Sequence, residues 1–498
     1  MGSFNLQDFL QALTYNPANP LMYQSVTFFL LFGVFYLLYS VCFNSRPLRN
    51  GILLLFSLYF YYKLSGLFVF ILIAMATSDY LIGHGMHRSK KSSAKNLLLA
   101  LSVIINVGAL FYYKYTNFLL ETWTGIVSPG AEPLVLKIIQ PIGISYFVFK
   151  TLTYVFDIHR EMIEKPEKSW FRYVLFVSFF PNILAGPISK ARDLLPQFIS
   201  KPDISKKALS MGIFLIMLGL IKKIAVADYI AANFVDRIFE SPEFFTGLDA
   251  FMASYGAMTQ LFFDFAGYTD MMVGFGFLMG FTIEHNFNKP FLAGNISEFW
   301  RRWHITLYNW LNEYLYQPLA FAWRRWKLAG AMLAVFLTFF ISGLWHGAAI
   351  TFVVWGLLHG TAIAWDVFSS STRKKVQKKM PKALYKVISI IITFHFLVFT
   401  SVLLKAKTFG DALDFWKKMF SEVDFGMFSK WFGIYSAPFL IMIIALILQW
   451  LPNKMYTAIF NFFKSWHWAI KALAFAVLVI ILYQLYILEA MPFIYIQF

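Results

Sequence analysis

Long apolar stretches follow one another along this chain, and short segments between them carry most of the polar residues. A helix needs about 20 apolar residues to cross a bilayer. Eleven stretches are long enough: 23–43, 66–86, 97–120, 137–156, 209–231, 251–279, 329–347, 349–368, 384–405, 434–451 and 468–488. A twelfth, 51–64, is short for a crossing. The pattern therefore predicts an all-α polytopic membrane protein with about 11–12 transmembrane helices.

One further apolar stretch is interrupted by residues that break helices. Residues 170–186 run into Phe180-Pro181-Asn182 and are followed by Gly186-Pro187. Irregular backbone at membrane depth is tolerated only where the protein itself buries it. We therefore expect a re-entrant segment here. Because no soluble stretch interrupts the pattern, residues 1–498 are expected to form a single membrane-embedded domain.

The composition supports a membrane protein and excludes the water-soluble classes. Hydrophobic residues make up 59% of the 498 residues and charged residues 14%, whereas a soluble protein averages about 25% charged residues. The lone cysteine, Cys42, excludes an internal disulfide and any site built from several thiolates. We therefore expect no metal site of that kind.

The positive charges indicate how the chain is oriented. The net charge is +17, and the basic residues gather in the short segments between apolar stretches. If both termini are extracytoplasmic, the cytoplasmic segments hold about 29 Lys and Arg and the outer ones about 5, which is the bias that cytoplasmic loops carry. Anionic lipid headgroups are then the expected partner, rather than nucleic acid. The sequence predicts a multi-pass protein of the cell (inner) membrane.

The segment 281–328 is too long and too aromatic for a plain linker, and the orientation places it on the cytoplasmic side. Ser297 is expected to cap a helix there. One face of that helix would carry large apolar side chains: Trp300, Trp303, Leu307 and Trp310. This spacing is typical of a helix that lies in the membrane interface, with Arg301 and Arg302 reaching toward water.

Among the nine histidines, His346 is the first candidate for catalysis. It lies in Gly343-Leu344-Trp345-His346-Gly347, where one apolar stretch ends and the next begins. A neutral imidazole costs less at membrane depth than a charge, and it accepts a proton as a general base must. The alternative is a packing role, with a hydrogen-bonded core histidine between helices that small residues bring together.

Two other histidines are not expected to be catalytic, because a structural role is expected for His359 and a solvated face for His84. His359 lies 13 residues beyond His346, which is about 20 Å along a continuous helix, so the two share a site only if the chain folds back between them. His84 lies beside the basic loop that begins at Arg88, and a solvated position is expected for it.

Two carboxylates, Asp264 and Asp270, lie inside the apolar stretch 251–279. Acidic residues inside a membrane span are a functional signal. Either one of them orients a histidine, or each pairs with an arginine and holds helices together. The sequence leaves both interpretations open.

Seven motifs in a fixed order carry a resemblance to a known family. They are Pro141-Ile142-Gly143-Ile144-Ser145-Tyr146, Phe179-Phe180-Pro181 with Ala185-Gly186-Pro187-Ile188, Asp264-Phe265-Ala266-Gly267-Tyr268-Thr269-Asp270-Met271, Asn286-Phe287-Asn288-Lys289-Pro290, Phe299-Trp300-Arg301-Arg302-Trp303-His304, Gly343-Leu344-Trp345-His346-Gly347 and Phe493-Ile494-Tyr495-Ile496-Gln497-Phe498. Together they resemble the membrane-bound O-acyltransferase family, in its bacterial AlgI-like branch of polysaccharide O-acetylation, which is related to DltB-like proteins.

The resemblance implies a ring of helices around a central tunnel that joins the two sides of the membrane. It implies that His346 is catalytic and that His304 is the second family histidine. An acyl thioester, acetyl-CoA, would arrive from the cytoplasm as a co-substrate, with no permanently bound cofactor. The acetyl group would pass to an extracytoplasmic polysaccharide acetyltransferase, which is the implied partner protein.

The remaining candidates are expected to bind donor or substrate: Arg301, Arg302, Trp303, Trp345, Asp264 and Asp270. Two alternative functions stay open at this point. One is DltB-like transfer of D-alanine to teichoic acid. The other is a transporter or flippase, in which Asp264, Asp270 and His346 form a proton relay.

Overall fold

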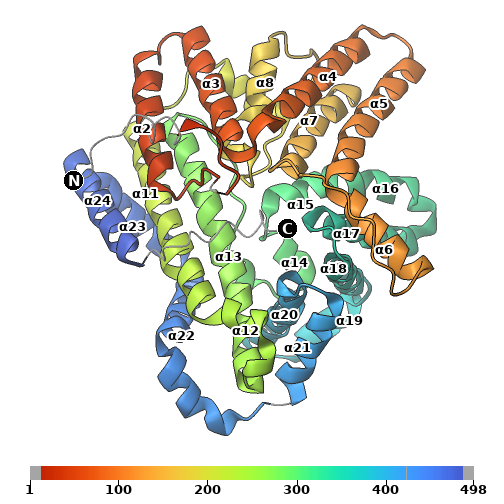
Figure 1. Ribbon diagram of the computed structural model, residues 1–498, viewed down its shortest axis with the longest axis vertical. Helices are drawn as coiled ribbons and strands as arrows, with labels where there is room; N and C mark the ends of the chain where they lie inside the picture. Colours follow the sequence, from red (N-terminus) through yellow and green to blue (C-terminus); the bar gives the residue numbers. More distant parts are fainter. Residues whose placement is uncertain (1–12, 19, 422, 486–498) are drawn as a thin grey trace. The chain divides into compact units, whose positions relative to one another are not determined.

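The computed structural model of this chain describes residues 13–18, 20–421 and 423–485. All regular secondary structure in these residues is helical (Figure 1). The predicted all-α fold is thereby confirmed. The chain divides into two compact units, Met1–Leu209 with Phe275–Ile283 and Ser210–Gly274 with Glu284–Phe498. The last family motif, Phe493–Phe498, lies outside the described residues.

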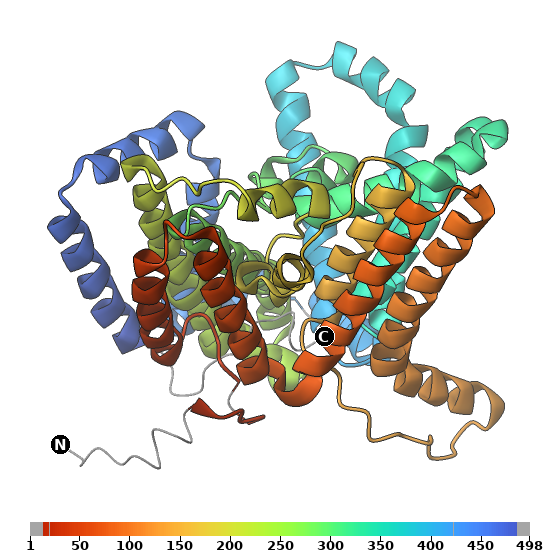
Figure 2. The same cartoon turned by 90° about the horizontal axis from the view of Figure 1, so that it is seen from above.

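The first unit contains nine of the described α-helices. They are α2 (Val26–Val41), α3 (Arg46–Ser65), α4 (Val69–Arg88), α5 (Ser92–Leu110), α6 (Thr116–Val127), α7 (Ile144–His159), α8 (Trp170–Ser178), α9 (Phe180–Ile183) and α10 (Ala191–Leu194). Helices α4 and α5 run side by side (orange in Figure 2), and α7 packs against both of them.

A buried polar network joins these three helices. The Asp79 carboxylate accepts hydrogen bonds from Ser102 Oγ at 2.6 Å and from Asn106 Nδ2 at 2.7 Å. Thr151 of α7 donates to Asn106 Oδ1 at 2.7 Å. All four side chains are fully buried. Because each group has a partner, the network stabilises the packing at little desolvation cost.

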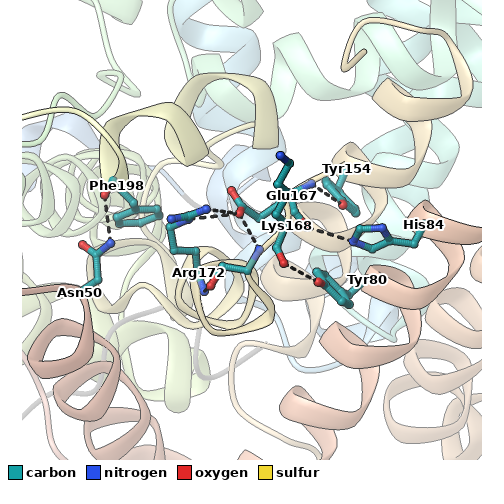
Figure 3. Close-up of polar contacts among 9 residues, drawn as sticks. Asn50, Tyr80, His84, Tyr154, Glu167, Lys168, Arg172 and Phe198 are labelled. Carbon is teal, nitrogen blue, oxygen red and sulfur yellow. Dashed lines mark hydrogen bonds and ion pairs between the residues drawn. The ribbon is translucent and has the colours of Figure 1, made fainter. Parts of the chain in front are cut away.

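Side chains from several elements hold the segment that follows α7, as Figure 3 shows. Arg172 donates to Glu167 Oε1 at 2.6 Å, and Tyr80 donates to the Lys168 carbonyl at 2.9 Å. His84 Nε2 lies 3.0 Å from the Glu167 carbonyl, to which it donates. The expectation of a merely solvated His84 is therefore wrong, because this half-buried ring fastens the loop.

The helix break expected within residues 170–186 is present, whereas the re-entrant course of this segment stays a prediction. Helix α8 ends at Ser178, and the single turn α9 follows with all its residues buried. The Asn182 side-chain amide donates to the Pro187 carbonyl at 2.6 Å and so pairs one of the groups that the broken helix leaves over. Protein thus surrounds the irregular backbone, as membrane depth requires.

The second unit holds the remaining α-helices of the described chain and three π-helical segments, η4, η5 and η8. They are α11 (Lys206–Leu220, which begins in the first unit), η4 (Ile221–Asp228), η5 (Ala231–Val235), α12 (Asp236–Glu240), α13 (Gly247–Leu278, which ends in the first unit), α14 (Ile296–Trp300), α15 (Ile305–Leu311), η8 (Asn312–Tyr316), α16 (Gln317–Ala322), α17 (Lys327–His346), α18 (Ile350–Phe368), α19 (Ser370–Lys379), α20 (Lys382–Lys405), α21 (Phe409–Ser421), α22 (Phe428–Trp450), α23 (Asn453–Ser465) and α24 (Trp468–Leu485).

In the described part of the chain, eight helical stretches are long and apolar enough to cross a membrane, which makes this a multi-pass membrane protein. The number is below the 11–12 crossings that the sequence predicts. Helices α2 and α7 have only 16 residues each, and the acidic residues of α13 lower its hydropathy. One of the eight, Arg46–Arg88, contains both α3 and α4, which separate at Gly66 with a φ of 60°.

Candidate active site

A tight helical hairpin positions His346. Helix α17 ends at this residue, the chain turns through Gly347, and α18 begins at Ile350. The two helices meet at glycines, since a Cβ added to Gly343 would lie 3.0 Å from the Cα of Gly356. Such close approach is what small residues allow between membrane helices. The chain therefore does fold back after His346.

The hydrogen bond of His346 defines its tautomer. The ring is buried, with 4% of its surface exposed, and its Nδ1 lies 2.6 Å from the carbonyl oxygen of Ser342. A carbonyl only accepts, so Nδ1 must carry the proton and donate it. The lone pair of the neutral ring is then on Nε2. This is the arrangement of a general base that is oriented through its other nitrogen.

His304 lies beside His346, with their ring centroids 6.5 Å apart and their planes at 78°. It is fully buried and caps the N-terminus of α15 with a φ of 43°. A non-glycine residue in this left-handed region costs on the order of 1–3 kcal/mol and persists only where its surroundings impose it. Such strain is frequent at functional sites.

The motif that begins at Asn286 imposes the conformation of His304. The Asn286 carbonyl accepts from the backbone N–H of Ile305 at 2.9 Å, and Asn286 Oδ1 accepts from Thr306 Oγ1 at 2.7 Å. Two residues on, the N–H of Asn288 donates to the Arg302 carbonyl at 2.9 Å. This segment thus holds the chain on both sides of His304, which gives the asparagine motif a physical role.

Burial lowers the pKa of His304 well below its ordinary value, and the neighbouring His346 lowers it further. His304 is therefore neutral at pH 7. A neutral ring can donate from one nitrogen and accept at the other, so it can polarise a carbonyl oxygen without placing a charge in the site.

His359, which the spacing separates from His346, lines one small cavity together with it. Trp300 Nε1 donates to His359 Nδ1 at 3.2 Å, because an indole nitrogen is only a donor. The other ring nitrogen, Nε2, must then carry the proton, and it donates to Thr400 Oγ1 at 3.2 Å. Both nitrogens of His359 are thus committed to protein partners, and the ring fixes Trp300 of α14 against α18.

Aromatic rings surround the histidines. Trp355 lies 4.9 Å from His346 and 4.6 Å from His359, measured between ring centroids. Trp345 lies 5.0 Å from His346 and 6.0 Å from His304. Trp303 stacks on Phe299 at 5.3 Å. The tryptophans Trp303 and Trp345, which the sequence nominates for substrate binding, therefore form the walls of this region.

The expectation of one interfacial helix capped by Ser297 is wrong in three respects. Residues 296–311 form two short helices, α14 and α15, which the left-handed His304 separates. The cap of α14 is Asn295, whose side chain accepts from the N–H of Glu298 at 2.8 Å. The large apolar face is buried inside the protein rather than in headgroups, with exposures of 7% or less: Trp300, Trp303, Leu307 and Trp310.

The two arginines of this segment have different surroundings. Arg302 forms an ion pair with Glu298 at 2.8 Å, one helical turn away. Arg301 is exposed and lines a cavity of about 240 Å³ together with Trp300. Roles for either arginine in donor binding remain predictions.

Asp264 and Asp270 both form ion pairs, with lysines rather than arginines. Asp264 pairs with Lys223 at 2.9 Å and Asp270 with Lys222 at 2.5 Å. The lysines lie on η4, which packs against α13. A Cβ added to Gly267 would lie 2.7 Å from the Gly219 carbonyl, so glycines again permit close contact. The pairing agrees with the helix-holding interpretation, although with lysines in place of arginines.

A small cavity of about 20 Å³ borders His346, and its other walls come from α13, α14, α18 and α20. Within the described residues, no group of three or more His, Cys, Asp or Glu side chains could hold a metal ion. The family resemblance named both His304 and His346, and His359 was expected to be structural, but nothing in the sequence analysis singled out Trp355 or Thr400. The i, i+4 spacing of Trp355 and His359 is the signal that could have shown them on one face of α18.

Comparison with known proteins identifies the class. The sequence profile of MBOAT, the membrane-bound O-acyltransferase family, matches residues 143–406, a range that contains both His304 and His346. The chain belongs to this family and is an acyltransferase. Membership of this family favours the acyltransferase over the transporter or flippase that the sequence also left open.

Curated relatives fall into three kinds. A peptidoglycan O-acetyltransferase from Helicobacter pylori is 34% identical, over 74% of this chain and 73% of the relative. A probable alginate O-acetylase AlgI from Pseudomonas aeruginosa is 35% identical, over 65% of this chain and 61% of the relative. A teichoic acid D-alanyltransferase from Bacillus subtilis is 28% identical, over 78% of this chain and 98% of the relative.

Proposed function

We propose that this enzyme transfers an acetyl group from a cytoplasmic thioester, acetyl-CoA, to a hydroxyl group on the other side of the membrane, for O-acetylation of a polysaccharide. The observation that carries the proposal is the buried His346, oriented through Nδ1, with His304 6.5 Å away. The acceptor would be presented by an extracytoplasmic acetyltransferase partner. The relatives named for peptidoglycan and alginate O-acetylation support the acetyl class.

The chemistry needs few groups, because a thioester is already activated. His346 Nε2 takes the proton of the attacking hydroxyl while the hydroxyl oxygen forms a bond to the acyl carbon. The C–S bond then breaks, and the thiolate of CoA takes up that proton from the imidazole. Atoms and charges balance: an ester and a free thiol replace the thioester and the alcohol. A general base contributes about 10²–10⁴ in rate to such a step.

The neighbours of His346 have supporting roles in this proposal. His304, neutral and held in a strained conformation, polarises the thioester carbonyl. Arg301, at the larger cavity, attracts the phosphates of the donor. Arg302 orients the same segment through its pair with Glu298. Trp303 and Trp345 shape the walls, whereas Asp264 and Asp270 hold α13 in place.

Transfer of D-alanine to teichoic acid is the second candidate. The observation in its favour is the D-alanyltransferase relative, 98% of whose length is matched. The two candidates differ in the donor, since D-alanine carries an ammonium group and acetate does not. Purified protein in nanodiscs, offered labelled acetyl-CoA or a D-alanyl thioester, would separate them by which thioester it cleaves.

Replacement of His346 tests the proposed role. In His346→Ala, acetyl transfer should fall by about 10²–10⁴, which corresponds to roughly 3–5 kcal/mol of barrier. The matched control is His395→Ala. His395 has the same local bond, from Nδ1 to a carbonyl four residues earlier at 2.8 Å, but it is exposed and lies away from the cavity. Undiminished transfer by a folded His346→Ala protein would end the assignment.

A further inference from the structure

The small cavity beside His346 is lined by apolar side chains that come from separate helices. Met258 of α13 and Leu397 of α20 are 3% and 2% exposed, and the half-buried Leu404 lies on the same α20 wall. His346 also borders this cavity. Because the lining side chains come from different helices of the second unit, one of them can be replaced to change the cavity while the helices stay intact.

The hydroxyl groups in this wall are turned toward the backbone. Thr400 donates to the Phe396 carbonyl at 3.0 Å and accepts from His359. Ser401 donates to the Val398 carbonyl at 2.7 Å. With these hydrogen bonds made inside the helix, the surface toward the cavity is apolar. An apolar cavity of this kind stays dry and takes an apolar group in preference to water.

The size of the cavity limits what it can hold. Its volume is about 20 Å³, and about 10–15 Å³ on this scale suffices for a single water molecule. A methyl group is of comparable size. Each further methylene would have to displace Leu397 or Met258, which are packed against other helices, and such overpacking is costly.

From size, apolarity and contact with His346, we infer that this cavity receives the methyl end of the acyl group, and that Met258 and Leu397 restrict the donor to a two-carbon, uncharged acyl chain. The inference rests on the proposed function, because it assumes that the acyl carbon lies within reach of His346. It goes beyond that function by naming the side chains that set donor selectivity.

The chemistry of the lining also disfavours D-alanine. A D-alanyl group would bring an ammonium into this space, and no aspartate or glutamate is among the residues that line it. A buried charge without a partner is strongly unfavourable. Asp264, the nearby carboxylate on α13, is paired with Lys223. The same wall that fits a methyl group therefore excludes the charged donor.

The test is a ratio of two rates measured on one preparation. Full-length protein in nanodiscs is given propionyl-CoA or acetyl-CoA, and release of CoA is followed. One extra methylene in a tight apolar pocket is worth about 10–200-fold, so the unaltered protein should prefer acetyl-CoA by about tenfold or more. Leu397→Ala and Met258→Ala should each raise the propionyl-to-acetyl ratio by about tenfold. Ile392→Ala, on the same α20 but 66% exposed, should leave it unchanged.

Because the ratio is independent of the folded fraction, partial loss of stability does not obscure the result. Binding of two non-cleavable ketone analogues, one for each donor, gives the same ratio where turnover is slow. Unchanged ratios in both cavity variants, with acetyl transfer intact, would overturn the inference and leave the proposed function standing. Equal use of both donors by the unaltered protein would also overturn it. Undiminished transfer by His346→Ala would instead remove the proposed function itself.

Discussion

Two helix contacts in the second unit bury ionisable residues and use them in opposite ways. Where η4 meets α13, Lys223 and Asp264 neutralise each other at 2.9 Å, and both are nearly fully buried. Where α17 meets α18, the buried ionisable group is His346, which donates to a backbone carbonyl and borders a cavity. Glycines permit close approach in both places.

The difference shows when an ionisable residue inside a membrane protein indicates function. Where opposite charges face each other across two helices, their attraction offsets the desolvation of both groups. Such a pair needs no catalytic role to explain why it is buried. An imidazole that is oriented through one nitrogen beside a cavity has no opposite charge facing it across the helix contact. We therefore assign structure to the carboxylates of α13 and chemistry to the imidazole of α17.

The largest effect on stability is expected at the buried ion pair. Asp264→Asn removes a charge that faces Lys223, and breaking a buried pair from one side costs about 3–5 kcal/mol. Lys223 retains Asp228 at 2.7 Å, so we expect about 3 kcal/mol. The free energy of unfolding in mixed micelles measures it. Asp414→Asn, at an exposed position, is the control and should change little.

The double variant sharpens this prediction. Asp264→Asn combined with Lys223→Met removes both members of this pair but leaves Asp228 without its lysine, so we expect it to recover only part of the stability that the single variant loses. If Asp264 were part of a proton relay, the folded fraction of the double variant would be inactive. If it only holds helices, acetyl transfer per folded protein should stay near that of the unaltered chain.

A medium effect is expected at the hairpin glycine. In Gly343→Ala the new methyl group would press against the backbone of Gly356. Overpacking of this kind costs about 1–3 kcal/mol, and it displaces the end of α17 that carries His346. Unfolding and acetyl transfer should both be affected. In Gly433→Ala, where no atom lies within 4 Å of the added Cβ, stability should be equal or slightly higher. Equal behaviour of the two variants would contradict the tight contact.

The smallest effect is a pH dependence of stability. The pKa of His304 is lowered in the folded protein, whereas an unfolded histidine has a pKa near 6.5. Below about pH 6.5 the unfolded chain therefore binds a proton that the folded one does not. The free energy of unfolding then decreases as the pH is lowered, by at most about 1.4 kcal/mol per pH unit. His304→Asn, which tolerates the left-handed backbone, should lose that share of the slope between pH 7 and 5.5. Identical slopes would mean that His304 titrates freely.

Much of the architecture could be predicted from the sequence, because the length of an apolar stretch indicates whether a helix can cross a membrane. The all-α membrane fold is confirmed, and His346 lies at the end of a hairpin helix as its position between two apolar stretches suggests. The break in the helix after Ser178 was predictable from the proline and glycine residues that follow, since these residues interrupt a helix.

The errors concern contacts that periodicity does not encode. Spacing along the chain separates His359 from His346, but the turn at Gly347 brings both to one cavity. The tryptophan spacing predicts a continuous helix, but the backbone of His304 is left-handed because Asn286 holds the residues beside it. The lysine partners of Asp264 and Asp270 lie in a π-helical stretch, whose register a 3.6-residue period does not follow.

One comparison tests the central claim most directly: the rate of acetyl transfer, per folded molecule, of His346→Ala against that of the Asp264→Asn and Lys223→Met double variant. We predict a loss of about 10²–10⁴ in the first and a rate close to that of the unaltered protein in the second. Retained transfer without the imidazole, or lost transfer without the ion pair, would contradict the division between chemistry and packing.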